Sequence, residues 1–302
     1  MTKIYVPDIE CDSCVRLISK KMKDNNIHNF KVDDESVVLD DASTKEKAIS
    51  IIRGLGYRAS EEPFENMTFK ERFRSVSENP EKYSVEFKGL TYAVNVFVIL
   101  LALFLIAYFG FLKAIPGFIQ SYAVWILYLL ISITVLSFGL WHFLSYRGRV
   151  THMAGMMIGM TFGMQTGMLI GAVLGATNGF FVGAMTGMIL GVIVGILTGK
   201  CCGIMGIMEG MMAGVMGGTM GPMITVMMIY DHISVFMPFF VGFNILIVLG
   251  LSYLFYEEVV EKGSGVERKP VDFALLASLC VIAGAVLILI MIYGPKSFIA
   301  GV

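Results

Sequence analysis

Charged residues are scarce in this sequence, and their scarcity excludes several classes of protein. Asp, Glu, Lys and Arg make up 16% of the 302 residues, and the formal net charge is −1. This balance leaves no basic surface of the kind that binds nucleic acid. Most of the charges lie in residues 1–90, whereas residues 91–302 are strongly apolar. We therefore expect a small soluble domain followed by an integral membrane domain.

Cysteine is also scarce, with an odd total of five: Cys11, Cys14, Cys201, Cys202 and Cys280. This number and spacing do not fit the disulfide framework of a small extracellular domain. In a reducing compartment a Cys-x-x-Cys motif more often binds a metal or takes part in catalysis. No cleavable signal peptide is expected, because residues 1–10 are short and mixed in character.

The motifs of ATP-driven pumps are missing. The chain has neither an Asp-Lys-Thr-Gly phosphorylation motif nor a glycine-rich P-loop. We therefore expect a protein that is not an enzyme. Any transport that it performs is expected to be passive or coupled to an ion gradient.

Seven apolar stretches are long enough to cross a bilayer as helices. They lie near residues 91–112, 121–146, 152–176, 179–198, 202–230, 233–256 and 271–293. Cytosolic loops of membrane proteins are rich in Lys and Arg. With the N-terminal domain in the cytosol, the inner loops hold Arg147, Arg149, Lys200, Lys262, Arg268 and Lys269. We expect a multi-pass protein of the cell membrane with its N-terminal domain in the cytosol and its C-terminus outside.

Glycine and methionine are concentrated in residues 152–228, which hold 17 of the 22 Met and 19 of the 33 Gly. Glycine recurs at every fourth residue in the rows Gly155–Gly175, Gly179–Gly203 and Gly206–Gly218. This spacing lets membrane helices approach backbone to backbone. We expect a glycine zipper in which the third to fifth spans form the tight centre of the bundle. The same faces can instead join protomers of a homo-oligomer.

The fifth span carries a row of soft ligands that begins at its predicted cytosolic end. The members of this row are Cys201, Cys202, Met205, Glu209, Met212, Met216, Met220 and Met223. From Cys202 onward they share a helical face of about 100°. Thiols and thioethers suit Cu(I), and an acidic residue inside a span is a functional candidate. Glu209 is expected to balance the charge of a cation or to carry a proton; the alternatives are an ion pair with Lys200 and, for the methionines, simple packing.

Two further groups extend this pattern. Met156, Met160, Met164 and Met168 form a second row on the third span. The pair Asp231 and His232 follows the fifth span, where it is either a second ligand pair or a plain polar loop.

Residues 1–62 are predicted to form an α+β domain of the ferredoxin-like type, with element order βαββαβ. Strands are expected at residues 3–6, 27–32, 36–39 and 57–60, with helices after Cys14 and over residues 43–53. The complete fold is therefore this domain joined to an all-α transmembrane bundle of about seven helices, residues 91–302. Residues 63–90 form the linker, in which residues 67–76 are either an amphipathic helix on the membrane surface or part of a flexible tether.

The N-terminal domain resembles the heavy-metal-associated (HMA) domains of copper chaperones, mercury-binding proteins and metal-pumping ATPases. The resemblance rests on Cys11-x-x-Cys14 at a strand-to-helix turn and on Gly56-Tyr57 before the last strand. It implies that Cys11 and Cys14 bind a soft metal ion and that Tyr57 lies near them. The usual Gly-Met-Thr before the first cysteine is replaced by Asp8-Ile9-Glu10, in which Ile9 fills the apolar position. The acidic neighbours add Zn(II) and Cd(II) to Cu(I) and Hg(II) as candidate ions.

These observations predict a membrane transporter of a soft metal ion, with Cu(I) favoured. The HMA-like domain would exchange metal with the Cys-Cys, Met and Glu row in the membrane. Expected partners are the lipid bilayer, the metal ion and a soluble metallochaperone, and no nucleic acid. The alternatives are a transmembrane thiol–disulfide electron carrier, which requires Cys280, and a metal-responsive sensor or assembly scaffold.

Overall fold

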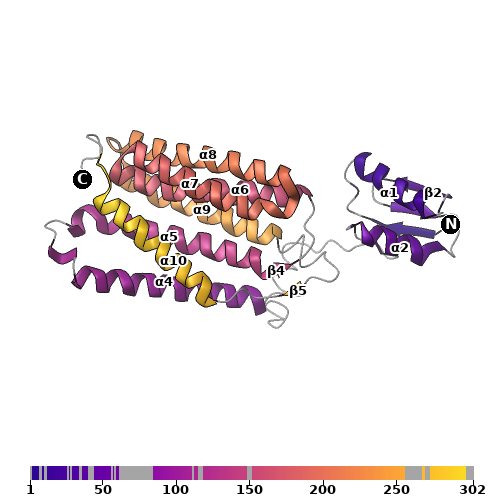
Figure 1. Cartoon of the computed structure of the whole chain (residues 1–302), viewed down its shortest axis with the longest axis horizontal. Helices are drawn as coiled ribbons and strands as arrows, with labels where there is room; N and C mark the ends of the chain where they lie inside the picture. Colours follow the sequence, from indigo (N-terminus) through magenta and orange to yellow (C-terminus); the bar gives the residue numbers. More distant parts are fainter. Residues whose placement is uncertain are drawn as a thin grey trace. The chain divides into compact units, whose positions relative to one another are not determined.

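The computed structural model describes residues 2–6, 9, 12–25, 27, 29–33, 36–39, 44–55, 57, 59–60, 84–110, 112–114, 118–147, 152–255, 267–268 and 273–296. The chain divides into two compact units, one holding the N-terminal sheet and the other the long helices (Figure 1). Each unit is considered by itself below.

The N-terminal unit is a small antiparallel sheet with two helices. Its elements are β1 (Thr2–Tyr5), α1 (Asp12–Asp24), β2 (Phe30–Asp33), β3 (Ser36–Leu39) and α2 (Lys45–Gly54). The strands lie in the order β1-β3-β2, so that β3 pairs with both neighbours. Alternation of side chains along a strand gives the sheet one buried face. That face packs against the helices in a core that includes Ile4, Ile18, Val37, Leu39 and Ile52.

The fourth strand predicted for this unit is reduced to a single bridge. Tyr5 N–H donates to the Ser60 carbonyl at 2.8 Å, and Ser60 N–H donates back to Tyr5 at 3.1 Å. The Arg53 guanidinium also donates to the Ala59 carbonyl at 2.9 Å, which ties the end of α2 to this segment. The order of the first five elements is therefore confirmed, whereas in the described residues of the range 57–60 the predicted last strand is limited to the bridge at Ser60.

The second unit contains seven long helices in the part of the chain that the structure describes. They are α4 (Ser84–Gly110), α5 (Phe118–Ser145), α6 (His152–Asn178), α7 (Phe180–Gly199), α8 (Gly203–Met228), α9 (Ile233–Phe255) and α10 (Phe273–Tyr293). Two short strands, β4 (Tyr146–Arg147) and β5 (Glu267–Arg268), pair with each other. The first helix begins at Ser84, inside the predicted linker.

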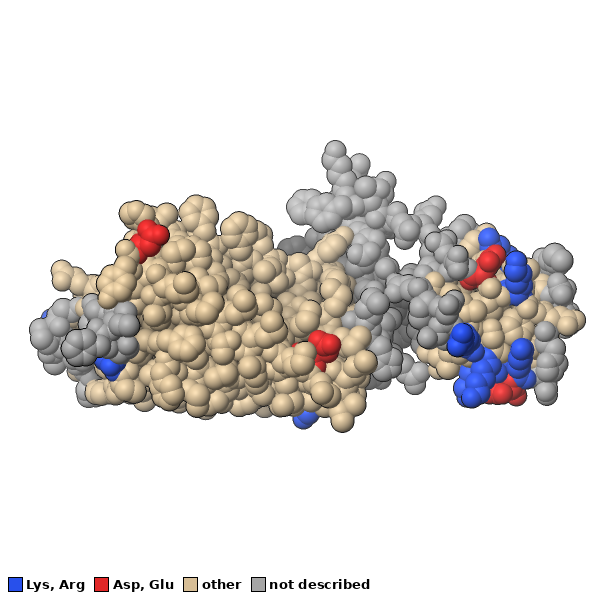
Figure 2. Space-filling model, turned by 90° about the horizontal axis from the view of Figure 1, so that it is seen from above, with Lys and Arg blue, Asp and Glu red and all other residues tan. Residues whose placement is uncertain are grey.

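Length and composition mark this unit as a multi-pass membrane protein. Among the described residues, six helical segments are long and apolar enough to cross a bilayer, and one of them, Phe180–Met228, is 49 residues long. That segment contains α7 and α8, which double back on each other, so seven helices arise from six segments. Charged side chains are few on the visible surface of the helical unit (Figure 2).

Two glycines with positive φ make the sharp turns of the glycine-rich region. Gly179, with φ of 97°, is the single residue between α6 and α7, and Gly203, with φ of 71°, opens α8 after the 3₁₀ turn η3 (Lys200–Cys202). Residues with a Cβ rarely adopt this conformation. These positions allow three consecutive helices to fold back on one another with almost no connecting loop.

The glycine rows bring α6, α7 and α8 into backbone contact within one chain. On α7 and α8, Gly199 meets Gly206 and Gly187 meets Gly218, which makes these helices antiparallel. A Cβ added to Gly191 of α7 would lie 2.9 Å from the Gly163 carbonyl oxygen of α6. Side chains would hold these backbones apart, so the close approach depends on glycine. The rows described here therefore pack inside the chain.

The three helices are tight, but they are not all at the centre of the bundle. The α6 span is 72% buried, the highest value of the six segments. Residues on the outer sides of α7 and α8, such as Ile189, Leu197 and Met212, are 48% or more exposed. The second layer forms around α5, whose Ile126 and Leu129 are fully buried. The expectation that the third to fifth spans form the centre therefore holds for α6 alone.

Replacing a glycine of this zipper should destabilise the helical unit. In Gly191→Ala the new methyl group meets backbone atoms of Gly163 and Gly214 at 2.9 and 3.0 Å, and backbone cannot move aside as a side chain does. We expect a loss of about 1–3 kcal/mol, typical of overpacking, measured by thermal unfolding in detergent. The matched control is Gly250→Ala on α9, where no atom lies within 4 Å of the added Cβ. Equal loss in both variants would contradict the zipper.

Candidate functional site

Two adjacent thiols occupy the turn between α7 and α8. Cys201 and Cys202 belong to η3, and their Sγ atoms are 3.6 Å apart. Cys201 is exposed and its thiol points to the Thr198 carbonyl at 3.4 Å, whereas Cys202 is only 4% exposed. Two sulfur ligands of one tetrahedral metal lie about 3.8 Å apart when each metal–sulfur bond is about 2.3 Å. The observed separation is therefore close to that of a shared metal ion.

A glycine of α6 makes room for this pair. A Cβ added to Gly155 would overlap the Cys202 Sγ and would lie 2.9 Å from the Cys201 Sγ. Both sulfur atoms therefore converge on the same point of the α6 backbone. At the Gly155 end of α6, the glycine zipper therefore packs the helices and also fixes the position of the thiol pair.

In the described part of the chain, no cluster of histidine and carboxylate ligands surrounds the thiols. Among the described residues, no group of three or more His, Cys, Asp and Glu side chains is placed to hold a metal. No ion pair joins Glu209 to Lys200, although both residues are described, and Glu209 is half-buried on α8. A structural pair with Lys200 is therefore not observed for this carboxylate.

The methionine row of α8 lies on the outside of the helical unit. Met205, Met212, Met216, Met220 and Met223 are between 39% and 64% exposed. The glycine row of the same helix is buried against α6 and α7. The predicted separation of a packing face from a sulfur face is therefore present, and the sulfur face is not the lining of an interior channel.

The remaining sequence candidates are placed as follows. On α6, Met156, Met164 and Met168 are half-buried and Met160 is 42% exposed. Between α8 and α9, the Asp231 carboxylate accepts a hydrogen bond from the backbone N–H of His232 at 2.8 Å. The two side chains are 68% and 91% exposed. Their arrangement is that of a polar turn.

The N-terminal cysteine motif is described only in part. Cys11 lies outside the described residues, and for Cys14 the structure gives the backbone position in the first turn of α1. Ile9 is 6% exposed and belongs to the core, as predicted for the apolar position before the motif. Tyr57 is half-buried against the same core. The metal-binding role of this motif stays a prediction.

Cys280 is engaged away from the other described cysteines. It is 7% exposed on α10, and its Sγ lies 2.8 Å from the Ser137 Oγ of α5. This contact joins two helices of the second layer. It gives Cys280 a packing role and supplies no partner for the pair at η3.

At the opposite end of α6, hydrogen bonds that the sequence did not predict join α6 to the end of α10; these contacts are called the clamp below. The Lys296 ammonium donates to the Met291 carbonyl at 2.7 Å and to the Thr177 carbonyl at 3.4 Å, and it lies over the ring of Tyr122. The Asn178 amide donates to the Ile290 carbonyl at 3.1 Å. A cation is favourable beside the carbonyl ends of helices.

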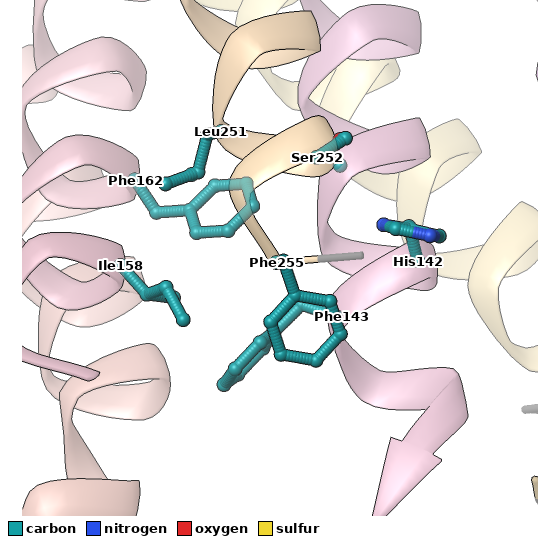
Figure 3. A pocket seen from close by; sticks show the side chains of 8 residues that line it. His142, Phe143, Ile158, Phe162, Leu251, Ser252 and Phe255 are labelled. Carbon is teal, nitrogen blue, oxygen red and sulfur yellow. The ribbon is translucent and has the colours of Figure 1, made fainter. Parts of the chain in front are cut away.

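A small pocket between α5, α6 and α9 offers few ligand groups. Six of its lining residues are Gly139, Phe143, Ile158, Phe162, Leu251 and Phe255, and Figure 3 shows His142 and Ser252 beside them. His142 is buried and makes ring contacts with Phe138 and Phe255. The pocket is largely apolar, so it does not replace η3 as the candidate site.

The comparisons with known proteins add no family to this picture. No protein-family model, curated protein or solved structure matches the chain.

The burial of the three described thiols predicts their order of reaction. In variants that retain one cysteine each, a membrane-permeant maleimide should label Cys201 faster than Cys202 or Cys280, because only Cys201 is exposed. Gly155→Ala should displace the Cys202 side chain and raise its labelling rate several-fold, while the rate at Cys280 stays unchanged. Mass spectrometry of timed samples measures both. Equal rates at all three positions would show that the η3 geometry is wrong.

Proposed function

We propose that this protein transports a soft metal ion, with Cu(I) as the favoured ion, through the thiol pair at η3. The observation that carries the proposal is the convergence of Cys201 and Cys202, with Sγ atoms 3.6 Å apart, on the α6 backbone at Gly155. One thiol is exposed and can receive a metal, and the other is buried and can retain it.

The donor set supports a soft monovalent ion. Apart from Glu209, the row provides only sulfur, first from two thiols and then from thioethers, and sulfur suits Cu(I). Zn(II) usually takes four ligands, drawn from cysteine, histidine and carboxylate. The described residues around η3 offer no such group of three or more. Glu209 would then balance the charge of the bound ion, since an isolated carboxylate at membrane depth is costly.

The N-terminal domain would supply or receive the metal. Its order β1-α1-β2-β3-α2 and the position of Cys14 at the start of α1 support the HMA-like interpretation and the ferredoxin-like topology expected with it. In this proposal Cys11 and Cys14 exchange the ion with Cys201 and Cys202 by successive ligand replacement, so that the metal is never released to water.

Beyond η3, the ion would move along the exposed methionine face of α8. Met205, Met212, Met216 and Met220 follow one another on that face, and each thioether can replace the one before it as a ligand. The path therefore runs on the outer surface of this chain, with Glu209 beside its first step. An electron carrier is less well supported, because Cys280 is in contact with Ser137.

Removing the thiol pair tests the proposal directly. The double variant Cys201→Ser, Cys202→Ser should lower Cu(I) flux into proteoliposomes by about tenfold or more, as loss of metal ligands usually does. A copper-sensitive dye inside the vesicles measures the flux under reducing conditions. Cys280→Ala is the matched control and should retain the flux of the unmodified protein. Unchanged flux in the double variant would refute a role for η3.

The methionine face is tested by substitutions that conserve volume. Met212→Leu, Met216→Leu and Met220→Leu together should reduce the initial rate of Cu(I) flux several-fold, because leucine offers no sulfur. Stability should change little, since such swaps are well tolerated. The control is Met185→Leu, a methionine on α7 that is 43% exposed. If the triple variant and the control transport equally, the methionines of α8 serve packing or lipid contact alone.

A further inference from the structure

Three buried polar side chains, each with one unpaired oxygen among the described residues, lie near mid-length of α6 and α9. Gln165 is the midpoint of α6 and Asn244 the midpoint of α9. Gln165, its neighbour Thr166 and Asn244 are 4% or less exposed. Among the described residues, Gln165 Oε1, Thr166 Oγ1 and Asn244 Oδ1 have no hydrogen-bond partner. Buried polar atoms in membrane helices are costly unless they are paired, and an unpaired group therefore suggests an ion or a ligand.

These oxygens are exceptions among the buried polar groups of the helical unit. The other six buried hydroxyls that the structure describes in this unit all bond to a backbone carbonyl; they are Ser132, Ser137, Ser145, Thr177, Thr198 and Thr225. The amide of Asn178 uses both its oxygen and its nitrogen. Thr166 does not form the usual bond to the preceding turn. The unsatisfied oxygens are therefore gathered at one depth rather than scattered.

The helix register brings α6 and α9 together at this depth. The Cβ position of Gly139 on α5 lies 2.8 Å from the Phe162 ring and 3.0 Å from the Val248 side chain, so these two residues meet. Ile158 and Phe162 share a pocket with Phe255 and Leu251, which makes α6 and α9 antiparallel. One turn from Phe162 is Thr166, and one turn in the same direction from Val248 is Asn244.

Buried apolar side chains lie on the turns above and below Thr166 and Asn244. Phe162 and Val248 are 3% or less exposed on one side, and Leu169 and Val241, on the next turns of the two helices, are 4% or less exposed on the other. The Asn244 Nδ2 donates to the Phe240 carbonyl at 2.6 Å, which leaves its Oδ1 as the unpaired end of the amide. The unpaired oxygens of Thr166 and Asn244 therefore lie between apolar turns of α6 and α9, and this position is called the oxygen-lined level below.

We propose that Gln165, Thr166 and Asn244 form a site for a monovalent alkali cation such as Na⁺ at the middle of the membrane. Carbonyl and hydroxyl oxygens are ligands for hard cations. A divalent ion ordinarily requires carboxylates, and the buried polar residues that the structure describes in this unit include none. Water that enters with the ion completes its coordination. The proposal stands independently of metal binding at η3.

Thermal unfolding of the purified full-length protein in nanodiscs tests this site. The melting temperature is compared in NaCl, KCl and choline chloride at equal ionic strength. We expect a rise of about 2–4 °C with an alkali ion, because a ligand that binds only the folded state stabilises it. In Thr166→Val and Asn244→Leu this rise should disappear. In choline, Thr166→Val should melt at or above the temperature of the unmodified protein, because an unpaired buried hydroxyl has been removed.

The matched control is Thr198→Val, which removes a buried hydroxyl bonded to the Val194 carbonyl at 2.8 Å. It should melt at a lower temperature in every salt and keep the full difference between alkali and choline. The variant Cys201→Ser, Cys202→Ser should also keep the difference, which separates this site from η3. Equal melting of the unmodified protein in all three salts, or a full difference in Thr166→Val and Asn244→Leu, would overturn the proposal.

Discussion

The contact of glycine backbones between α6, α7 and α8 is the constraint on which the helical unit depends. Where Gly195 faces Gly210 and Gly163 faces Gly191, no side chain separates the helices. In lipid the hydrophobic effect does not drive helices together, so dispersion between closely packed backbones has to do so. Glycines also shape both ends of α6. At one end, Gly155 leaves room for the thiol pair. At the other end, Gly179 makes the turn beside which Asn178 and Lys296 donate hydrogen bonds to backbone carbonyls.

This packing explains why the methionines of α8 face outward. A helix whose inner face is filled by glycine has its large residues on the other side, so Met212 and Met216 are exposed. A sulfur surface and a tight helix pair are consequences of one sequence pattern. The candidate cation level lies on the opposite side of α6, toward α9, where ordinary side chains pack and polar groups can be held apart from lipid.

Much of this architecture could be predicted because its signals are periodic. The rows of glycine at every fourth residue predicted the close trio, and hydropathy predicted the long helices within a few residues of their ends. Hydropathy did not predict the start of α4 at Ser84, because it detects where lipid contact begins rather than where the helix begins. The first residues of α4 are largely polar, and its apolar run follows them.

The prediction of a fourth strand was less successful, because the described segment near Ser60 pairs with its neighbour only at Tyr5. Gln165 and Asn244 carry no charge, so they do not stand out as ionisable residues do, although a neutral amide within an apolar run is itself a signal. The clamp at Lys296 depends on contacts between distant segments, which no local pattern contains.

The single-residue turn at Gly179 and the short turn η3 also bear on how the protein is made. The contacts of α6, α7 and α8 join segments that are neighbours in sequence, and contacts of this local kind form early. These three helices can therefore assemble as soon as α8 has entered the bilayer, before α9 and α10 have packed against them. The thiol pair at η3 is then in place before the helical unit is complete. The oxygen-lined level forms only when α9 packs against α6. The two candidate sites therefore form at different stages of biogenesis.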